Sequence, residues 1–347
     1  MPTSNTADKL STEVLVGDVL TTIERERERD IVAKRFGLFE RRETLEQIGE
    51  TLGITRERVR QLEKSVVNHL KQAAEQGKLA KLDTFETATL DKLSAVGQVA
   101  KTSALTDMLV GNTDRKEQSR ITFLAELSPK LVTIDEDDTY CSAIGVKSVF
   151  DESAIKANVE KIIGAVTKFN TPKNIDAIAK SAGIDDPKQA EALASISKQL
   201  ASLNDQWGLM KWPIVNPKNI RDKIYVILKE NGKYMHFNEI ADSIKKSDFK
   251  RKDVTTQAIH NELIKDKRFV LIGRGIYALK EWGYEKGTVA DIITDVLKEA
   301  KEPLHRDEIV RRVLKSRFVK ETTILLNLQG KSQFKRVAKA TYELAED

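Results

Sequence analysis

The sequence has one cysteine, Cys141, among its 347 residues. A single thiol cannot form an intramolecular disulfide or a cage of several thiolates around a metal, and it is typical of proteins that fold in a reducing compartment. The apolar runs are far too short for a membrane span, and no signal peptide precedes the first predicted domain. The sequence therefore predicts a cytoplasmic, nucleoid-associated protein without a membrane segment.

Catalytic motifs are also missing. The sequence contains no phosphate-binding loop, no Gly-rich dinucleotide turn and no Ser-His-Asp candidate set. Among the four histidines, His236 and His305 each stand three residues before a glutamate, Glu239 or Glu308, which favours helix capping over metal ligation. We expect no enzyme, no metal and no cofactor.

The excess of positive over negative charge is small. The formal net charge is only +5, and 40% hydrophobic with 32% charged residues is ordinary for a globular chain of two or three domains. The small positive excess agrees with a surface that approaches phosphates, but it does not establish nucleic-acid binding.

The most specific pattern lies between Thr44 and Leu70 and predicts a helix-turn-helix. Thr44 and Gln47 form a capping box at the start of one helix, Gly53 supplies a left-handed end, and Thr55 caps a second helix. Apolar residues at helical spacing fit two short helices packed across a tight turn, with the small Gly49 at their crossing.

The second of these helices is amphipathic. Its apolar positions are Val59, Leu62, Val66 and Leu70. The opposite face then holds a polar set that can read bases, because Arg can bind guanine, Gln adenine, and Glu the cytosine amino group. This set is Arg56, Glu57, Arg60, Gln61, Lys64 and Asn68. A merely solvated polar face on a helical hairpin is the alternative.

Residues 25–71, RERERDIVAKRFGLFERRETLEQIGETLGITRERVRQLEKSVVNHLK, resemble region 4 of the sigma-70 family, which binds the promoter −35 element. The resemblance implies base contacts for Arg56, Glu57 and Gln61, and backbone contacts for Arg35, Arg60 and Lys64. Only 22 residues precede Ile23, so we expect no room for the sigma segment that melts the −10 element. We therefore expect something other than a complete sigma factor.

Helices are expected at Thr12–Ile23 and Glu24–Phe36, which place the helix-turn-helix domain at residues 1–76. Four later segments repeat one plan, namely three helices and two strands ending in an aromatic residue: Tyr140, Trp207, Tyr277 or Tyr342. This plan is that of a winged helix. We expect a mainly α fold with small β-hairpin wings, in which a helix-turn-helix head precedes a tandem array of winged-helix domains at residues 84–145, 152–214, 216–283 and 287–347.

The third segment also resembles the HARE-type winged helix of the RNA polymerase delta subunit, through NPKNIRDKIYVILKENGKYMHFNEIADSI and RFVLIGRGIYALKEWGY. The fourth segment is a weaker relative, since LHRDEIVRRVL parallels MHFNEIADSI.

Charge distinguishes the wings. The acidic turn Asp135–Asp138 would be repelled by phosphate, so the first segment is a spacer or a protein contact. Secondary DNA contacts are possible in the third and fourth segments, with a solvated basic surface as the alternative: Lys250, Arg251, Lys252, Arg274, Arg311 and Arg312.

The sequence thus favours a DNA-binding transcription protein that recognises a promoter-like element on double-stranded DNA and associates with the RNA polymerase core. One alternative is a delta-like adaptor of RNA polymerase that does not read DNA. Another is the targeting subunit of a restriction or repair system. The sequence does not determine the oligomeric state.

Overall fold

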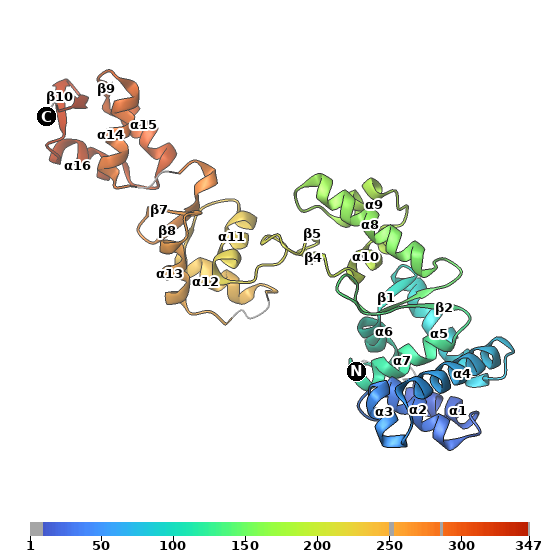
Figure 1. Ribbon diagram of the computed structural model, residues 1–347. Coiled ribbons are helices and arrows are strands. Elements are labelled where there is room, and N and C mark those ends of the chain that lie inside the picture. The colour runs from blue at the N-terminus through green and yellow to red at the C-terminus, as the bar shows by residue number, and fades with distance from the viewer. Residues whose placement is uncertain (1–9, 250–252, 285–286, 346–347) are drawn as a thin grey trace, which may run out of the picture. The chain divides into compact units, whose positions relative to one another are not determined.

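The computed structural model describes residues 10–249, 253–284 and 287–345, and they form a mainly helical chain with small antiparallel sheets (Figure 1). The chain divides into two compact units, Met1–Lys211 and Trp212–Asp347. The first unit begins with a head of four helices: α1 (Thr12–Thr21), α2 (Glu26–Phe36), α3 (Leu45–Leu52) and α4 (Arg56–Glu75).

Two repeats complete the first unit. The first repeat, residues 80–146, contains α5 (Ala80–Val96), β1 (Val99–Lys101), α6 (Thr102–Val110), α7 (Arg115–Leu127), β2 (Leu131–Ile134) and β3 (Ala143–Val146). The second repeat, residues 152–209, contains α8 (Glu152–Phe169), α9 (Ile175–Ala182), α10 (Pro187–Ile196), β4 (Leu200–Leu203) and β5 (Gln206–Leu209).

The second unit contains two further repeats. The third repeat, residues 220–283, contains α11 (Ile220–Asn231), β6 (Met235–His236), α12 (Phe237–Lys246), α13 (Thr256–Lys265), β7 (Phe269–Gly273), β8 (Ile276–Leu279) and the short 3₁₀ helix η1 (Lys280–Trp282). The fourth repeat, residues 289–344, contains α14 (Val289–Ala300), β9 (Leu304–His305), α15 (Arg306–Ser316), α16 (Glu321–Gly330), β10 (Phe334–Ala338) and β11 (Thr341–Leu344).

The four repeats share one element order. In the first, third and fourth, the last strand lies at the centre of a three-stranded sheet, giving the orders β1-β3-β2, β6-β8-β7 and β10-β11-β9. In the second repeat a single bridge between Lys173 and Trp207 stands where the others have their first strand. Trp207, Tyr277 and Tyr342 lie on the last strand of their repeats, as predicted.

The prediction for Tyr140 is wrong. The first repeat has no tight turn at Asp135–Asp138, because the connection from β2 to β3 runs through residues 135–142. Tyr140 lies in this connection rather than in a named strand, and it forms an isolated bridge with Ser197 of the second repeat. Sequence spacing alone placed it on a strand because the connection is several residues longer than in the other repeats.

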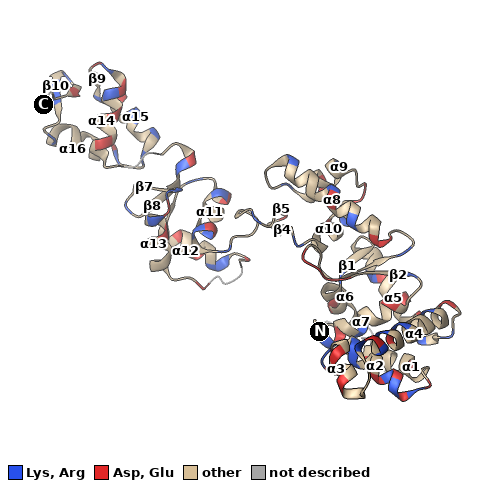
Figure 2. Cartoon of the chain, viewed as in Figure 1, with Lys and Arg blue, Asp and Glu red and all other residues tan. Residues whose placement is uncertain are grey.

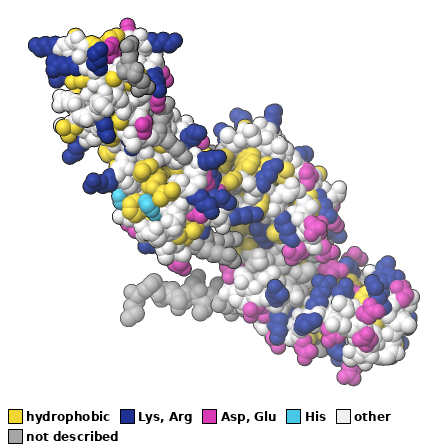
Figure 3. Space-filling view, turned by 60° about the vertical axis from the view of Figure 1, so that its left-hand side comes forward, with side chains coloured by type: hydrophobic (Ala, Val, Ile, Leu, Met, Phe, Trp, Pro, Cys, Tyr) yellow, Lys and Arg dark blue, Asp and Glu magenta, His cyan; other side chains and the backbone are white. Residues whose placement is uncertain are grey.

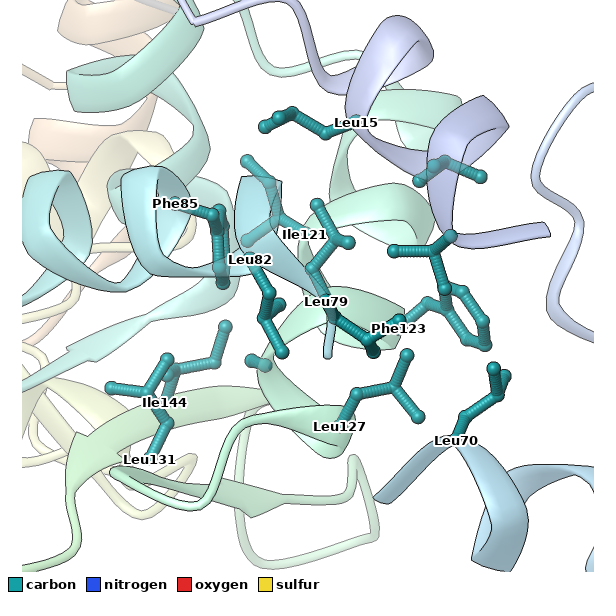
Figure 4. Packing of buried hydrophobic residues seen from close by; sticks show 14 of the residues in the cluster. Leu15, Leu70, Leu79, Leu82, Phe85, Ile121, Phe123, Leu127, Leu131 and Ile144 are labelled. Atoms are coloured by element: carbon teal, nitrogen blue, oxygen red, sulfur yellow. The ribbon is translucent and has the colours of Figure 1, made fainter. Parts of the chain in front are cut away.

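The head and the first repeat share one hydrophobic core. Leu15 on α1 and Leu70 on α4 belong to the same buried cluster as Phe85, Phe123 and Leu127 of the first repeat (Figure 4). Leu79, in the short connection from α4 to α5, and Leu82, in the first turn of α5, are buried in the same core. The head therefore packs directly on the first repeat, and α7 lies within the contact.

Candidate nucleic-acid interface

The helix-turn-helix forms through local signals. The Thr44 hydroxyl accepts a hydrogen bond from the Gln47 backbone N–H at 3.2 Å, and the Gln47 side chain accepts one from the Thr44 N–H at 2.9 Å, which completes the predicted capping box. Gly53 ends α3 with a φ of +65°. Thr55 then caps α4 by accepting from the Arg58 N–H. All three predicted signals are confirmed.

The close approach of α3 to α4 depends on Gly49. A Cβ at this position would lie 2.7 Å from the carbonyl oxygen of Ile54 in the turn, which is closer than real contacts allow. A small core holds the two helices to α2, with Ile31, Ile48 and Val59 fully buried. This core fixes which face of α4 remains outside.

The exposed face of α4 carries an ordered polar network. Arg60 binds Glu57 through two hydrogen bonds of 2.7 and 2.8 Å, and Gln61 donates to the same carboxylate at 3.4 Å. The hydrogen bond and the charge of Arg60 lower the pKa of the Glu57 carboxyl and raise the pKa of Arg60. The carboxylate is therefore held ionised, in the acceptor form that can bind a cytosine amino group.

The structure brings most of the predicted reading residues together. Arg56, Glu57, Arg60, Gln61 and Lys64 are all exposed on the first three turns of α4. In Figure 2, Lys and Arg positions lie along the start of α4.

Arg35 is placed differently from these five. Its Nε lies 3.3 Å from the Glu63 carboxylate, and the two side chains are only 26% and 19% exposed. This half-buried pair joins α2 to α4, so the structure gives Arg35 a supporting role in addition to any phosphate contact.

Sequence reasoning missed Arg58. This residue is exposed in the first turn of α4, and its guanidinium donates to the Gln61 side chain at 3.4 Å. The spacing of three residues between the two positions was the available signal, because such pairs are neighbours on a helix. Arg58 therefore helps to orient Gln61 and adds a cation to the reading surface.

A depression beside α3 is unsuited to phosphates. An open depression of about 420 Å³ lies between α3 and the loop before it. Three carboxylates, those of Glu40, Glu43 and Glu50, line it together with Arg41. The acidic lining disfavours phosphate binding in this depression, whereas the exposed face of α4 carries several cations.

The secondary candidates have mixed environments. Lys250, Arg251 and Lys252 lie outside the described residues. Arg274 is exposed in the turn between β7 and β8, as predicted. In contrast, Arg311 and Arg312 both bind Glu308, each with a shortest distance of 2.6 Å, and lower the pKa of that carboxyl to about 2. Both arginines belong to the second helix of their repeat, α15, and are already ion-paired.

The histidines act mainly in capping and packing. His236 accepts from the Asn238 N–H, and Glu239 accepts from the His236 N–H, so the expected capping box forms. His305 also caps α15, but Glu308 binds arginines rather than the backbone, and the expected reciprocal bond is absent. His260, on α13, is half-buried against Phe237 and Tyr277.

Within the described ranges, no three His, Cys, Asp or Glu side chains gather to hold a metal ion. No helix in those ranges has the length and apolarity needed to cross a membrane.

Residues 25–72 match the family model described as Sigma-70, region 4. The match contains all of the helix-turn-helix and every base-reading candidate on α4, and it covers less than a sixth of the chain. The geometry and the match agree on the kind of module. This segment is a sigma region 4-like helix-turn-helix with a DNA-binding, transcription-related role.

Proposed function

We propose that this chain is a transcription protein that recognises a promoter-like DNA element through α4 and associates with the core of RNA polymerase. The observation that carries the proposal is the exposed, mutually ordered set Glu57, Arg58, Arg60 and Gln61 at the start of α4. Its donors and acceptors match the base edges of the major groove, and the first turns of a recognition helix are the part that reaches them. The reading module is non-enzymatic and acts in the cytoplasm.

We further propose that the four repeats are winged helices. The shared order of elements and the central last strand support this assignment. The resemblance of residues 216–283 to the HARE type agrees with association with polymerase, because that domain occurs in the delta subunit.

A polymerase-binding adaptor that does not read DNA is the second candidate. The first repeat favours this adaptor. Its third helix, α7, holds the position of the DNA-reading helix in a winged helix, and the head covers α7. The carboxylates in its β2–β3 connection also oppose phosphate contact. These features describe the first repeat alone and leave the exposed α4 face unexplained.

Selection from a pool of randomised duplexes would test the proposal. We expect the full-length protein to enrich one short motif, and Gln61→Ala to lose that enrichment while retaining nonspecific binding. Gln72→Ala is the matched control, because Gln72 is exposed near the other end of α4. Enrichment of no motif by the wild-type protein, together with capture of core polymerase in solution, would support the adaptor and overturn base reading.

A further inference from the structure

The β-hairpins of the four repeats become progressively more positive along the chain. The first hairpin, residues 131–146, has four carboxylates and no Lys or Arg, a formal charge of −4. The second, residues 200–209, has one carboxylate and a charge of −1. The third, residues 269–279, has one arginine and a charge of +1, and the fourth, residues 334–344, has three cations against one carboxylate, a charge of +2.

The cations of the fourth hairpin are available to a ligand. Lys335, Arg336 and Lys339 are all exposed. The Lys335 ammonium lies 3.8 Å from the Glu343 carboxylate, a weak pair whose lysine side chain is 67% exposed. Among the residues that the structure describes, neither Arg336 nor Lys339 forms an ion pair.

Other arginines of the fourth repeat are occupied. Arg311 and Arg312 share Glu308, and Arg306 pairs with Asp307. Arg317 is half-buried and donates to the Gly287 carbonyl. In addition, α16 contains no Lys or Arg, so the third helix of this repeat offers phosphates no cation.

We propose that the β10–β11 hairpin is a sequence-independent contact for the phosphates of duplex DNA. Lysine and arginine side chains held on a hairpin can neutralise phosphates and release counterions without reading bases. The fourth repeat, at the top of Figure 3, bears many Lys and Arg side chains on its surface. The proposal rests on the proposed function, since it assigns the backbone contacts that assist a head which reads DNA.

The test is a salt titration of full-length protein on a random-sequence duplex. The hairpin variant is Lys335→Gln with Arg336→Gln and Lys339→Gln, and the control variant removes the same charge through Lys298→Gln, Lys301→Gln and Lys315→Gln, all exposed in the same repeat. Loss of three phosphate contacts should flatten the log–log salt slope by about 2.7. Wild-type affinity should then fall roughly 40-fold more than that of the hairpin variant between about 50 and 200 mM salt.

A complementary variant guards against misfolding. Glu343→Gln removes the one carboxylate of the hairpin and should strengthen binding to random duplex, which a damaged fold would not do. An unchanged slope in the hairpin variant, or an equal loss in the control, would overturn the hairpin contact while leaving the α4 function intact. Failure of the wild-type protein to bind any duplex would instead overturn the proposed function together with the hairpin contact.

Discussion

Replacing Arg120 with methionine should loosen the contact between the head and the first repeat. Arg120 lies on α7 and its side chain is only 7% exposed. It donates to the Leu38 carbonyl of the head at 2.7 Å, to Glu117 at 2.9 Å and to Glu13 on α1 at 2.8 Å. Methionine keeps the apolar stem of the side chain and removes all three bonds.

The expected cost follows from the burial of each partner. Glu13 is 65% exposed, so its bond to Arg120 contributes less than about 1 kcal/mol. Glu117 is 16% exposed, and the Leu38 carbonyl loses a charged donor in a buried position. Removing the arginine from these two groups costs about 2–4 kcal/mol in total, slightly below the range for a fully buried pair because Glu117 retains its bond from the Thr12 hydroxyl.

Hydrogen exchange measured by peptide would localise the effect. A loss of 2–4 kcal/mol lowers protection roughly 30- to 900-fold, and we expect this in α1 and α7 but not in the second unit. Arg115→Met is the control, because Arg115 is an exposed arginine on the same helix. Equal protection in the two variants would refute the argument that Arg120 ties the head to the first repeat.

Three other predictions concern the head and the fourth repeat. Arg56→Ala should weaken binding to a selected site by about 1–3 kcal/mol relative to binding to random duplex in a competition assay, whereas Lys64→Ala should weaken both equally. The same ratio of specific to random affinity in both variants would contradict base reading by Arg56. Gly49→Ala should destabilise the head by about 1–3 kcal/mol in thermal unfolding because its Cβ would meet the Ile54 carbonyl. Gly17→Ala, where a Cβ meets nothing within 4 Å, should be neutral or stabilising. A larger loss of stability in Gly17→Ala than in Gly49→Ala would show that the close approach of α3 to α4 does not require glycine at position 49. The pKa of Glu308 is lowered to about 2 from an ordinary 4.5, so its ion pair stabilises the fold at pH values above the unfolded-state pKa of 4.5. The difference in stability between wild type and Glu308→Gln should therefore be full at neutral pH and vanish as the pH falls from about 4.5 to about 2. A difference that persists at pH 2 would exclude this ion pair as its source.

The helix-turn-helix could be predicted because its determinants are local. Thr44, Gly53 and Thr55 each act within four residues of their own position, so their spacing in the sequence is also their spacing in the structure. The outward face of α4 followed from helical periodicity in the same way. The hydrogen bonds within this face were less predictable. Helix spacing gives Glu57, Arg58 and Arg60 several candidate partners, and the rotamers decide among them.

The contact between the head and the first repeat was not visible in the sequence. Arg120 lies 82 residues from Leu38, and within its own helix it looks like an ordinary charged position. The pairing of Arg311 and Arg312 with Glu308 is a different case, because Glu308 stands three and four residues before them on one helix, a spacing that the sequence already contained and that the prediction overlooked. The partner of Arg120 was therefore set by tertiary packing, whereas the partner of Arg311 and Arg312 was set by local helix geometry.

The distribution of cations on α4 and on the third helices of the four repeats separates base reading from phosphate contact. The helix α4 carries five Lys or Arg residues, whereas α10 and α13 carry one each and α16 none. The remaining third helix, α7, is packed into the core shared with the head. If only α4 reads bases, the specific interface is that of a single module, about 600–1,000 Å² of protein surface, and such an interface needs backbone contacts to hold a site at physiological salt. The exposed cations of the β10–β11 hairpin could supply them without altering which sequence is chosen, because phosphates are the same in every sequence.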